Sequence, residues 1–318
     1  MRILVTGATG FVGRHLVRAL AHDHEVIAVA RRPVEVPGAD EVLTVPSIDS
    51  ATDWSGLLED VEMVVHLAAR VHVMQETSDE PLEAFREINV RGTRRLAKAC
   101  VDQGVRRLVF LSSIKVNGEV TQGSPFRAGD DPAPVDPYGV SKLEAEQALA
   151  EVAAGTRLEV VVLRPTVIYG AGVKGNVQRL MRLIETRIPI PLGAVRNARS
   201  MLSIGNLITW ITESIRADDV PGSVVLVADP EPVSTPSLIR ALAEGMGYRT
   251  FQIPVPIALL NLAGRLVGQS PALQRLTGDL VVEPTTGAFP QVGSKLKSPR
   301  GELVSLGKSS RNASGSVE

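Results

Sequence analysis

The stretch Arg2–Gly13, "RILVTGATGFVG", decides the fold of this chain. Its opening apolar run, "RILVT", predicts a buried strand. Gly7, Gly10 and Gly13 follow with the spacing G-x-x-G-x-x-G, and the residues after them have helical periodicity. Glycine permits a tight turn and lets the backbone approach a diphosphate, while the helix N-terminus offers free N–H groups and partial positive charge. The stretch therefore predicts a dinucleotide-binding strand–turn–helix unit.

Apolar runs and helical segments alternate along the first half of the chain. The runs predicted to be strands are "RILVT", "EVIAVA", "MVVHLA", "RLVFLS" and "LEVVVLR". They are nearly continuous, as in a parallel sheet that is covered on both faces. This alternation predicts an α/β fold with a Rossmann-like, doubly wound parallel sheet over residues 1–169. Phe11 and Val12, in the first helix, join the three glycines as predicted cofactor-binding residues.

The pattern changes after residue 169. Residues 170–282 predict a smaller lobe of mixed helices and strands, and its run "GSVVLVAD" could return to the main sheet. Residues 283–318 are rich in Ser, Gly and Lys and lose the periodicity, so we expect a disordered tail.

Composition excludes several classes of protein. The chain has 318 residues with 34 basic and 35 acidic side chains, so nothing indicates a nucleic-acid partner. Its single cysteine, Cys100, falls in a helical pattern; we expect it in the core, with no disulfide, no thiolate zinc cluster and no metal site. The N-terminus turns glycine-rich too early for a signal peptide, which predicts a cytoplasmic protein. The most apolar late stretch, "FQIPVPIALLNLAGRLVG", contains two prolines and Arg265, which favours a buried or interface helix over a membrane span.

The end of the second predicted strand bears on the choice of cofactor. An NAD site usually has an acid there, which bonds the ribose 2′-hydroxyl. Here Ala30 takes that position, and Arg31 and Arg32 follow. An arginine can pair with a 2′-phosphate that an acid would repel. The sequence favours NADP and leaves NAD open.

The stretch "DPYGVSKLEAE" carries the predicted chemistry. Asp136 predicts an N-cap and Pro137 fits the first helical position, so Tyr138 and Lys142 lie one turn apart on the same helix face. Ser113 ends a predicted strand and lies on the cofactor side of a parallel sheet. A nearby ammonium and a nicotinamide cation would both favour the phenolate and lower its pKa. Tyr138 could then exchange a proton with a substrate oxygen that Ser113 holds.

These motifs resemble the extended short-chain dehydrogenases/reductases, the group that includes UDP-glucose 4-epimerase. The matching pieces, in order over residues 1–170, are "TGATGFVG", "HLAA", "PLEAFREINVRGT", "LSSIKVNG", "YGVSK" and "LRPTVIYG". The resemblance implies Ser113, Tyr138 and Lys142 as the catalytic set, with Lys142 also bonding the nicotinamide ribose. It places Ala68 along the cofactor and Asn89 behind the site.

The resemblance is thinner beyond residue 170. It implies a nucleotide-sugar lobe in which Asn176 and Arg199 contact the nucleotide diphosphate. The chain departs from the family where Asn206 replaces a usual aspartate. The resemblance also implies a homodimer built from the helices of 81–103 and 137–153.

The family offers several reactions on a nucleotide sugar. Dehydratases carry acids directly after the catalytic Ser or Thr, where this chain has Ile114 and Lys115. The NADP preference favours a reductase, and the "SSIKVNG" and "DPYGVSK" segments look most like bacterial UDP-4-keto-sugar reductases of the UDP-N-acetylquinovosamine type, which serve surface polysaccharide synthesis. A UDP-hexose 4-epimerase with tightly bound NAD is the alternative. A non-catalytic dinucleotide sensor is a second alternative, against which the retained Tyr138 and Lys142 speak.

Overall fold

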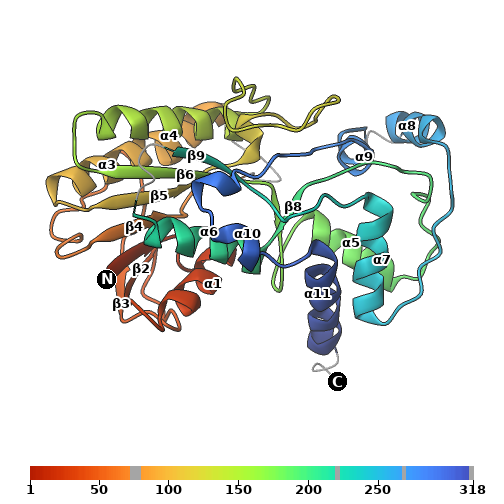
Figure 1. Ribbon diagram of the computed structural model, residues 1–318, viewed down its shortest axis with the longest axis horizontal. Coiled ribbons are helices and arrows are strands. Elements are labelled where there is room, and N and C mark those ends of the chain that lie inside the picture. Colours follow the sequence, from red (N-terminus) through yellow and green to blue (C-terminus); the bar gives the residue numbers. More distant parts are fainter. Residues whose placement is uncertain (72–79, 219–222, 267–269, 315–318) are drawn as a thin grey trace.

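A parallel sheet of seven strands forms the larger part of the molecule (Figure 1). The computed structural model describes residues 1–71, 80–218, 223–266 and 270–314. In spatial order the strands are β3 (Glu41–Thr44), β2 (Glu25–Ala30), β1 (Arg2–Thr6), β4 (Met63–His66), β5 (Arg107–Leu111), β6 (Glu159–Pro165) and β9 (Ser223–Val227). The order runs outward in both directions from β1 and β4, so the connections diverge at that point. In such sheets ligands bind beyond the carboxyl ends of the strands where the order reverses. The predicted doubly wound sheet is confirmed.

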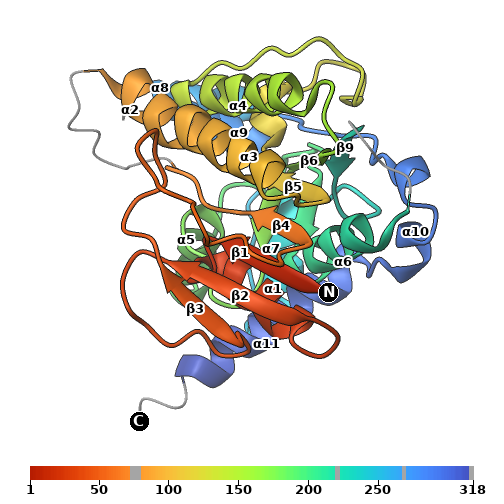
Figure 2. The same ribbon diagram turned by 90° about the vertical axis from the view of Figure 1, so that its left-hand side faces the viewer.

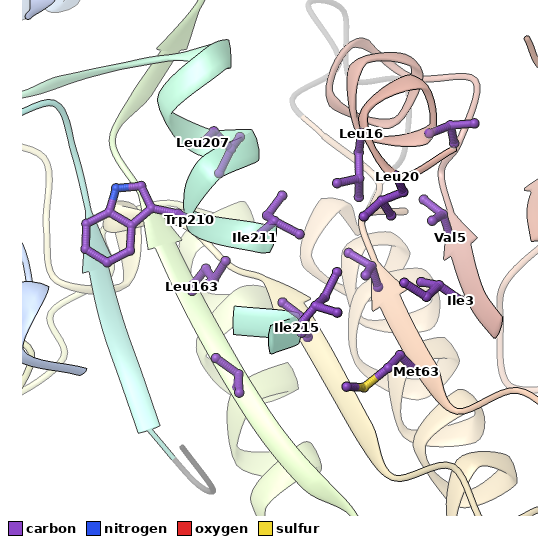
Figure 3. Close-up of a cluster of buried hydrophobic side chains, with 14 of the residues drawn as sticks. Ile3, Val5, Leu16, Leu20, Met63, Leu163, Leu207, Trp210, Ile211 and Ile215 are labelled. Atoms are coloured by element: carbon purple, nitrogen blue, oxygen red, sulfur yellow. The ribbon is translucent and has the colours of Figure 1, made fainter. Parts of the chain in front are cut away.

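Helices cover both faces of this sheet, as the nearly continuous apolar strands require (Figures 1 and 2). On one face α1 (Phe11–Leu20) and α6 (Ile204–Arg216) bury Leu16, Leu20 and Trp210 against the strands (Figure 3). The other face is covered by α3 (Thr93–Asp102) and α4 (Pro137–Ala153), and there the predicted core residue Cys100 is fully buried.

The second lobe is built from helices around a two-stranded parallel sheet of β7 (Val167–Tyr169) and β8 (Met201–Ser203). Its helices are α5 (Asn176–Glu185), α7 (Thr235–Met246), α8 (Ile257–Leu266), α9 (Ser270–Thr277) and α11 (Pro299–Ser314). Short elements complete the fold: α2 (Pro81–Phe85), η1 (Arg86–Gly92), η2 (Ile114–Val116), η3 (Thr286–Ala288) and α10 (Val292–Lys295). None of the helices in the described ranges combines the length and the apolarity needed to cross a membrane.

Two segments of the predicted second lobe belong to the first. The run "GSVVLVAD" contains β9, which pairs with β6 at the edge of the main sheet. Helix α6 packs on the main sheet, where Trp210 and Ile211 are fully buried. Residue 169 therefore marks the end of the chain's first passage through the sheet, and the chain returns to it twice.

The expectation of a disordered tail over 283–318 is wrong for its described part, 283–314. Helix α11 packs along α7, and the two helices cross where both have glycine. A Cβ at Gly245 would lie 2.1 Å from the Val304 carbonyl oxygen, and one at Gly307 would lie 2.4 Å from the Leu242 carbonyl oxygen. The small residues that indicate disorder in the sequence are thus the residues that allow close packing. Residues 315–318 lie outside the described part of the chain.

Asn206, the departure from the family pattern, has a clear structural role. Its Nδ2 donates to Asp229 Oδ1 at 2.7 Å, and its Oδ1 accepts from the Lys297 backbone N–H at 2.9 Å. An aspartate could not donate to Asp229, and two carboxylates there would repel. The amide joins the end of β9 to the segment that leads into α11.

Candidate active site

A cavity of about 740 Å³ opens at the carboxyl ends of the central strands, on both sides of the β1–β4 junction. Its lining brings together ten of the residues singled out from the sequence: Gly7, Gly10, Phe11, Val12, Gly13, Arg31, Ala68, Ser113, Tyr138 and Lys142. Arg32, Asn176 and Arg199 lie outside the lining. One continuous space thus joins the glycine turn to the tyrosine–lysine pair.

The glycine turn fits a bound diphosphate. Gly7 has φ +69°, and a Cβ there would lie 2.8 Å from the Ala68 backbone nitrogen, so only glycine is tolerated. A Cβ at Gly13 would lie 2.2 Å from the Gly7 carbonyl oxygen. Gly10 caps helix α1 without a side-chain hydrogen bond, and no acid lies in the first turn. The N–H groups at this helix end are therefore available to an anion in the cavity.

A chain of buried hydrogen bonds fixes the end of β4 beside this turn. Thr6 Oγ1 accepts from the Ala68 backbone N–H at 3.2 Å and lies 2.7 Å from His66 Nδ1. His66 Nε2 lies 3.0 Å from Thr93 Oγ1. Burial lowers the pKa of His66 to about 3, so the ring stays neutral. Because Ala68 lines the cavity, these bonds hold one wall of the predicted cofactor site.

The neighbouring helix is distorted where it meets this wall. Residues Arg86–Gly92 form a π-helical segment between α2 and α3. Asn89 in that segment accepts from the Arg70 backbone N–H at 2.8 Å and donates to the Arg70 carbonyl and to Ser141 Oγ, each at 3.0 Å. Asn89 therefore ties the loop after β4 to helix α4, which carries the tyrosine and the lysine. π-helical turns of this kind occur frequently at functional sites.

The start of α4 is held from both sides. Asp136 Oδ1 accepts from the Gly139 backbone N–H at 2.7 Å, which confirms the predicted N-cap. Lys115 pairs with Asp136 and, at 2.8 Å, with Glu119. Ser113 Oγ accepts from the Lys115 backbone N–H at 3.2 Å. The position where dehydratases carry an acid is thus used here by a lysine that anchors the helix start.

Tyr138 and Lys142 lie one turn apart, as predicted. Lys142 is buried, and its Nζ donates to the Leu111 carbonyl at 2.8 Å and lies 6.0 Å from the centre of the Tyr138 ring. The Tyr138 ring packs edge-on against Phe85. Ser113, Tyr138 and Lys142, the three predicted catalytic residues, all line the same cavity.

Burial works against the predicted lowering of the tyrosine pKa. The pKa of Tyr138 is raised to about 12, mainly by burial and also by the nearby Asp136 carboxylate. Burial also lowers the pKa of Lys142 to about 7, which Glu146 partly opposes. The sequence argument assumed a charged ammonium in contact with the phenol. Desolvation outweighs that attraction, because Lys142 is buried, Tyr138 is half-buried, and the ammonium lies 6.0 Å from the ring centre.

One turn beyond Lys142, Glu146 belongs to a closed network. Arg164 donates to both of its carboxylate oxygens, at 3.0 and 2.6 Å, and Ser112 Oγ donates to Oε1 as well. Arg164 Nη1 also donates to Asn117 Oδ1 at 2.9 Å. All four side chains are buried, which fixes α4 to β6 and to the end of β5, directly behind the site. This network was missed from the sequence because its members are separated along the chain.

Comparison with known proteins decides the family. The model of the NAD-dependent epimerase/dehydratase family matches residues 3–226. The UDP-glucose 4-epimerase of Vibrio cholerae is 45% identical over 284 residues, which cover 88% of this chain and 87% of that protein. This chain belongs to the NAD-dependent epimerase/dehydratase family. It is an enzyme of the extended short-chain dehydrogenases/reductases, so the predicted family is confirmed.

Other family members widen the range of substrates. The N-acetyl-α-D-glucosaminyl-diphospho-ditrans,octacis-undecaprenol 4-epimerase of Escherichia coli O157:H7 is 27% identical over 81% of this chain and 77% of its own. The solved structure of MoeE5 in complex with UDP-glucuronic acid and NAD has a TM-score of 0.76 and 25% identity, and the match covers 98% of this chain and 100% of that one. Nucleotide sugars and NAD are thus bound in the family at this level of similarity.

Several lining residues were not among the predicted site residues. Val45, Ser47 and Ile48, directly after β3, line the cavity. The run "EVLT" of β3 was not among the runs predicted to be strands; it is short and lies partly exposed at the sheet edge. Pro165 and Thr166, by contrast, stand in the "LRPTVIYG" motif, which was a usable signal.

Proposed function

We propose that this protein is a UDP-hexose 4-epimerase that works with tightly held NAD. The observation that carries the proposal is the 45% identity to the Vibrio cholerae UDP-glucose 4-epimerase over 88% of the chain. The Tyr138/Lys142 pair, Ser113 and the glycine turn line one cavity, which agrees with this assignment. The epimerase alternative of the sequence analysis therefore fits better than its main interpretation, a UDP-4-keto-sugar reductase.

The residues of the cavity fit a nicotinamide dinucleotide. The N-terminus of α1 and the turn Gly7–Gly13 would hold the diphosphate, Ala68 would lie along the cofactor, and Lys142 would bond the nicotinamide ribose. When bound, NAD would accept a hydride from C4 of the sugar and return it to the other face, and its positive ring would favour the tyrosine phenolate.

The side chains of this chain would handle the proton. Tyr138 Oη would take the proton of the C4 hydroxyl and later give it back to the same oxygen. Ser113 would hold that oxygen by a hydrogen bond. The pKa of Lys142 is lowered to about 7, mainly by burial, and a bound group that favours the charged ammonium would raise it again. The bond from Nζ to the Leu111 carbonyl fixes the orientation of the side chain. Tyr138 is half-buried, so substrate can reach it from the cavity.

NAD replaces the predicted NADP in this proposal because the matching family is described as NAD-dependent and the MoeE5 structure contains NAD. Arg31 lines the cavity and is exposed, and its ability to pair with a 2′-phosphate remains a prediction. Incubation of the purified enzyme with UDP-glucose and no added cofactor should yield UDP-galactose, detected by anion-exchange chromatography. The denatured enzyme should release NAD. Strict dependence on added NADPH and a 4-keto sugar would instead restore the reductase interpretation.

The substrate lobe and the subunit contact remain proposals. Asn176 is exposed at the first position of α5, and Arg199 donates to the Gly278 carbonyl at 3.0 Å; we propose both as ligands of the nucleotide diphosphate. Arg199→Ala and Asn176→Ala should raise KM more than they lower kcat.

Helices α3 and α4 lie side by side, with Arg94 paired to Glu151 at 2.7 Å, and we propose them as the homodimer surface. Sedimentation velocity at micromolar concentration tests this, and a monomer would contradict it.

A further inference from the structure

The second lobe carries a concentrated apolar surface, none of whose residues lines the catalytic cavity. Among the described residues, thirteen large apolar side chains are exposed. Seven of them come from two neighbouring segments and form what we call the α8 patch: Ile188, Phe251, Ile253, Ile257, Leu259, Leu262 and Leu266. Phe251 is 70% exposed and Leu266 is 79% exposed. A patch of this kind indicates an interaction surface.

The two segments are joined by backbone hydrogen bonds. The Ile190 N–H donates to the Phe251 carbonyl and the Ile253 N–H donates to the Ile190 carbonyl, both at 2.9 Å. The chain then enters α8 at Ile257. Ile188, two residues before Ile190, therefore lies close to Phe251, and the patch continues through Ile253 onto the helix.

Helix α8 differs from an ordinary surface helix because apolar side chains stand on its solvent-facing side. Leu260 and Gly264, four residues apart, are its buried residues, and a Cβ at Gly264 would lie 3.0 Å from Leu273 Cδ2 of α9. At 100° per residue, Leu262 and Leu266 point away from that contact. A helix on the surface of a monomer normally has polar residues there. The outward side of α8 is therefore the side that something else covers (its place at the edge of the second lobe is seen in Figure 1).

The charge around the patch identifies the covering surface. Residues 186–200 and 245–278 contain no aspartate or glutamate, although the whole chain is balanced at 34 basic to 35 acidic residues. Three exposed arginines lie within three residues of patch residues along the chain: Arg187, Arg249 and Arg265. An apolar helix face with flanking arginines and no acids matches an anionic lipid surface.

A second copy of the chain fits this surface poorly. In a two-fold contact through the α8 patch, each residue would meet the same region of its partner. The arginines of both copies would then face one another with no acid in either segment, and like charges in such an interface are costly. We propose that the α8 patch docks the enzyme on the surface of an anionic lipid bilayer, with α8 lying in the plane of the headgroups. This proposal goes beyond the epimerase activity and does not depend on it.

The test is co-sedimentation of the full-length enzyme with vesicles. We expect binding to vesicles of phosphatidylglycerol and phosphatidylcholine in about equal parts, and much weaker binding to phosphatidylcholine alone. Arg265→Glu should weaken binding to the anionic vesicles about fivefold or more, since each basic residue near such a surface contributes about that factor. High salt should act in the same direction.

Leu262→Glu should lower binding about tenfold to a hundredfold, because the leucine can no longer be buried in the bilayer. The matched control is Val34→Glu, which adds the same charge at an exposed apolar residue outside the patch and should bind as the parent does. Both variants should keep the parent's turnover of a water-soluble UDP-sugar, which shows that they fold.

Two results would overturn the proposal. One is failure of the parent enzyme to sediment with the anionic vesicles, or equal binding by Leu262→Glu and Val34→Glu. The other is a dimer in solution that Leu262→Glu dissociates without any change in vesicle binding. That second result would assign the patch to a contact between copies of the chain.

Discussion

Helix α4 carries two buried charged residues on successive turns, Lys142 and Glu146, and their hydrogen bonding differs. Lys142 has one hydrogen-bond partner, the Leu111 carbonyl, and burial moves its pKa to about 7. Glu146, one turn later, accepts hydrogen bonds from both Arg164 and Ser112. Lys142 lines the cavity and can respond to a bound molecule, whereas Glu146 is already hydrogen-bonded within the protein. We call groups of the first kind acting residues and groups of the second kind holding residues.

The largest expected effect is on catalysis alone. Tyr138→Phe removes the hydroxyl that we propose exchanges the proton, and it should lower turnover about 10²–10⁴-fold. The midpoint of urea unfolding should stay close to that of the parent, because the ring keeps its contact with Phe85. Tyr248→Phe removes a hydroxyl in the second lobe and is the matched control, with turnover unchanged. Near-normal turnover of the Tyr138 variant would show that this residue is not catalytic.

The opposite behaviour is expected at Arg164. Arg164→Met leaves the Glu146 carboxylate buried without its partner and should lower the free energy of unfolding by about 3–5 kcal/mol. Arg164→Met with Glu146→Leu should recover much of that loss, because no charge then remains buried. Arg216→Met breaks the exposed pair with Asp23 and should cost less than about 1 kcal/mol. Equal effects of the buried and exposed variants in urea unfolding would contradict a holding role for Glu146 and Arg164.

The structural role of His66 should appear as a dependence of the free energy of unfolding on pH. Its ordinary pKa is about 6.5, and burial lowers it to about 3 in the folded protein. Between these values the unfolded chain binds a proton that the folded chain does not, so stability falls as the pH falls. The loss from this group should be about 2 kcal/mol between pH 7 and pH 5. Urea unfolding of His66→Gln should lack that part of the pH dependence, and identical pH curves would rule it out.

The last change, at Lys142, should be a small gain in stability. The pKa of Lys142 is lowered on folding from 10.5 to about 7, so between these values the unfolded chain binds a proton that the folded chain does not, and the full cost is present below about pH 7. Lys142→Met removes that cost and one hydrogen bond, and we expect the free energy of unfolding at pH 6 to rise by about 1 kcal/mol. Turnover should be lost. A marked loss of stability would place Lys142 with Glu146 instead, among the residues that hold.

The sequence predicted best what depends on neighbouring residues. The Gly7–Gly13 turn, the Asp136 cap and the Tyr138/Lys142 spacing each act within one or two helical turns, and the structure has them as expected. The Ser112–Glu146–Arg164 network joins three separate elements, which no local pattern reveals. Helix α11 was missed because its glycine and serine content predicts disorder, and only contact with α7 makes Gly307 an advantage. The tyrosine pKa was misjudged because proximity of charges was weighed without burial.

The π-helical segment Arg86–Gly92 has a consequence for how this region tolerates change in chain length. A π-turn is an α-helix with one residue inserted, so deletion of a single residue here would produce a longer regular helix. The flanking turns would keep nearly the same orientation, because the π-turn already absorbs the extra residue, and the change would fall on the residues of the bulge itself. Asn89 would leave Arg70 and Ser141, while nothing in the composition would have changed. In this segment the number of residues matters as much as their type, so a relative that lacks one residue here should also lack the contacts of Asn89.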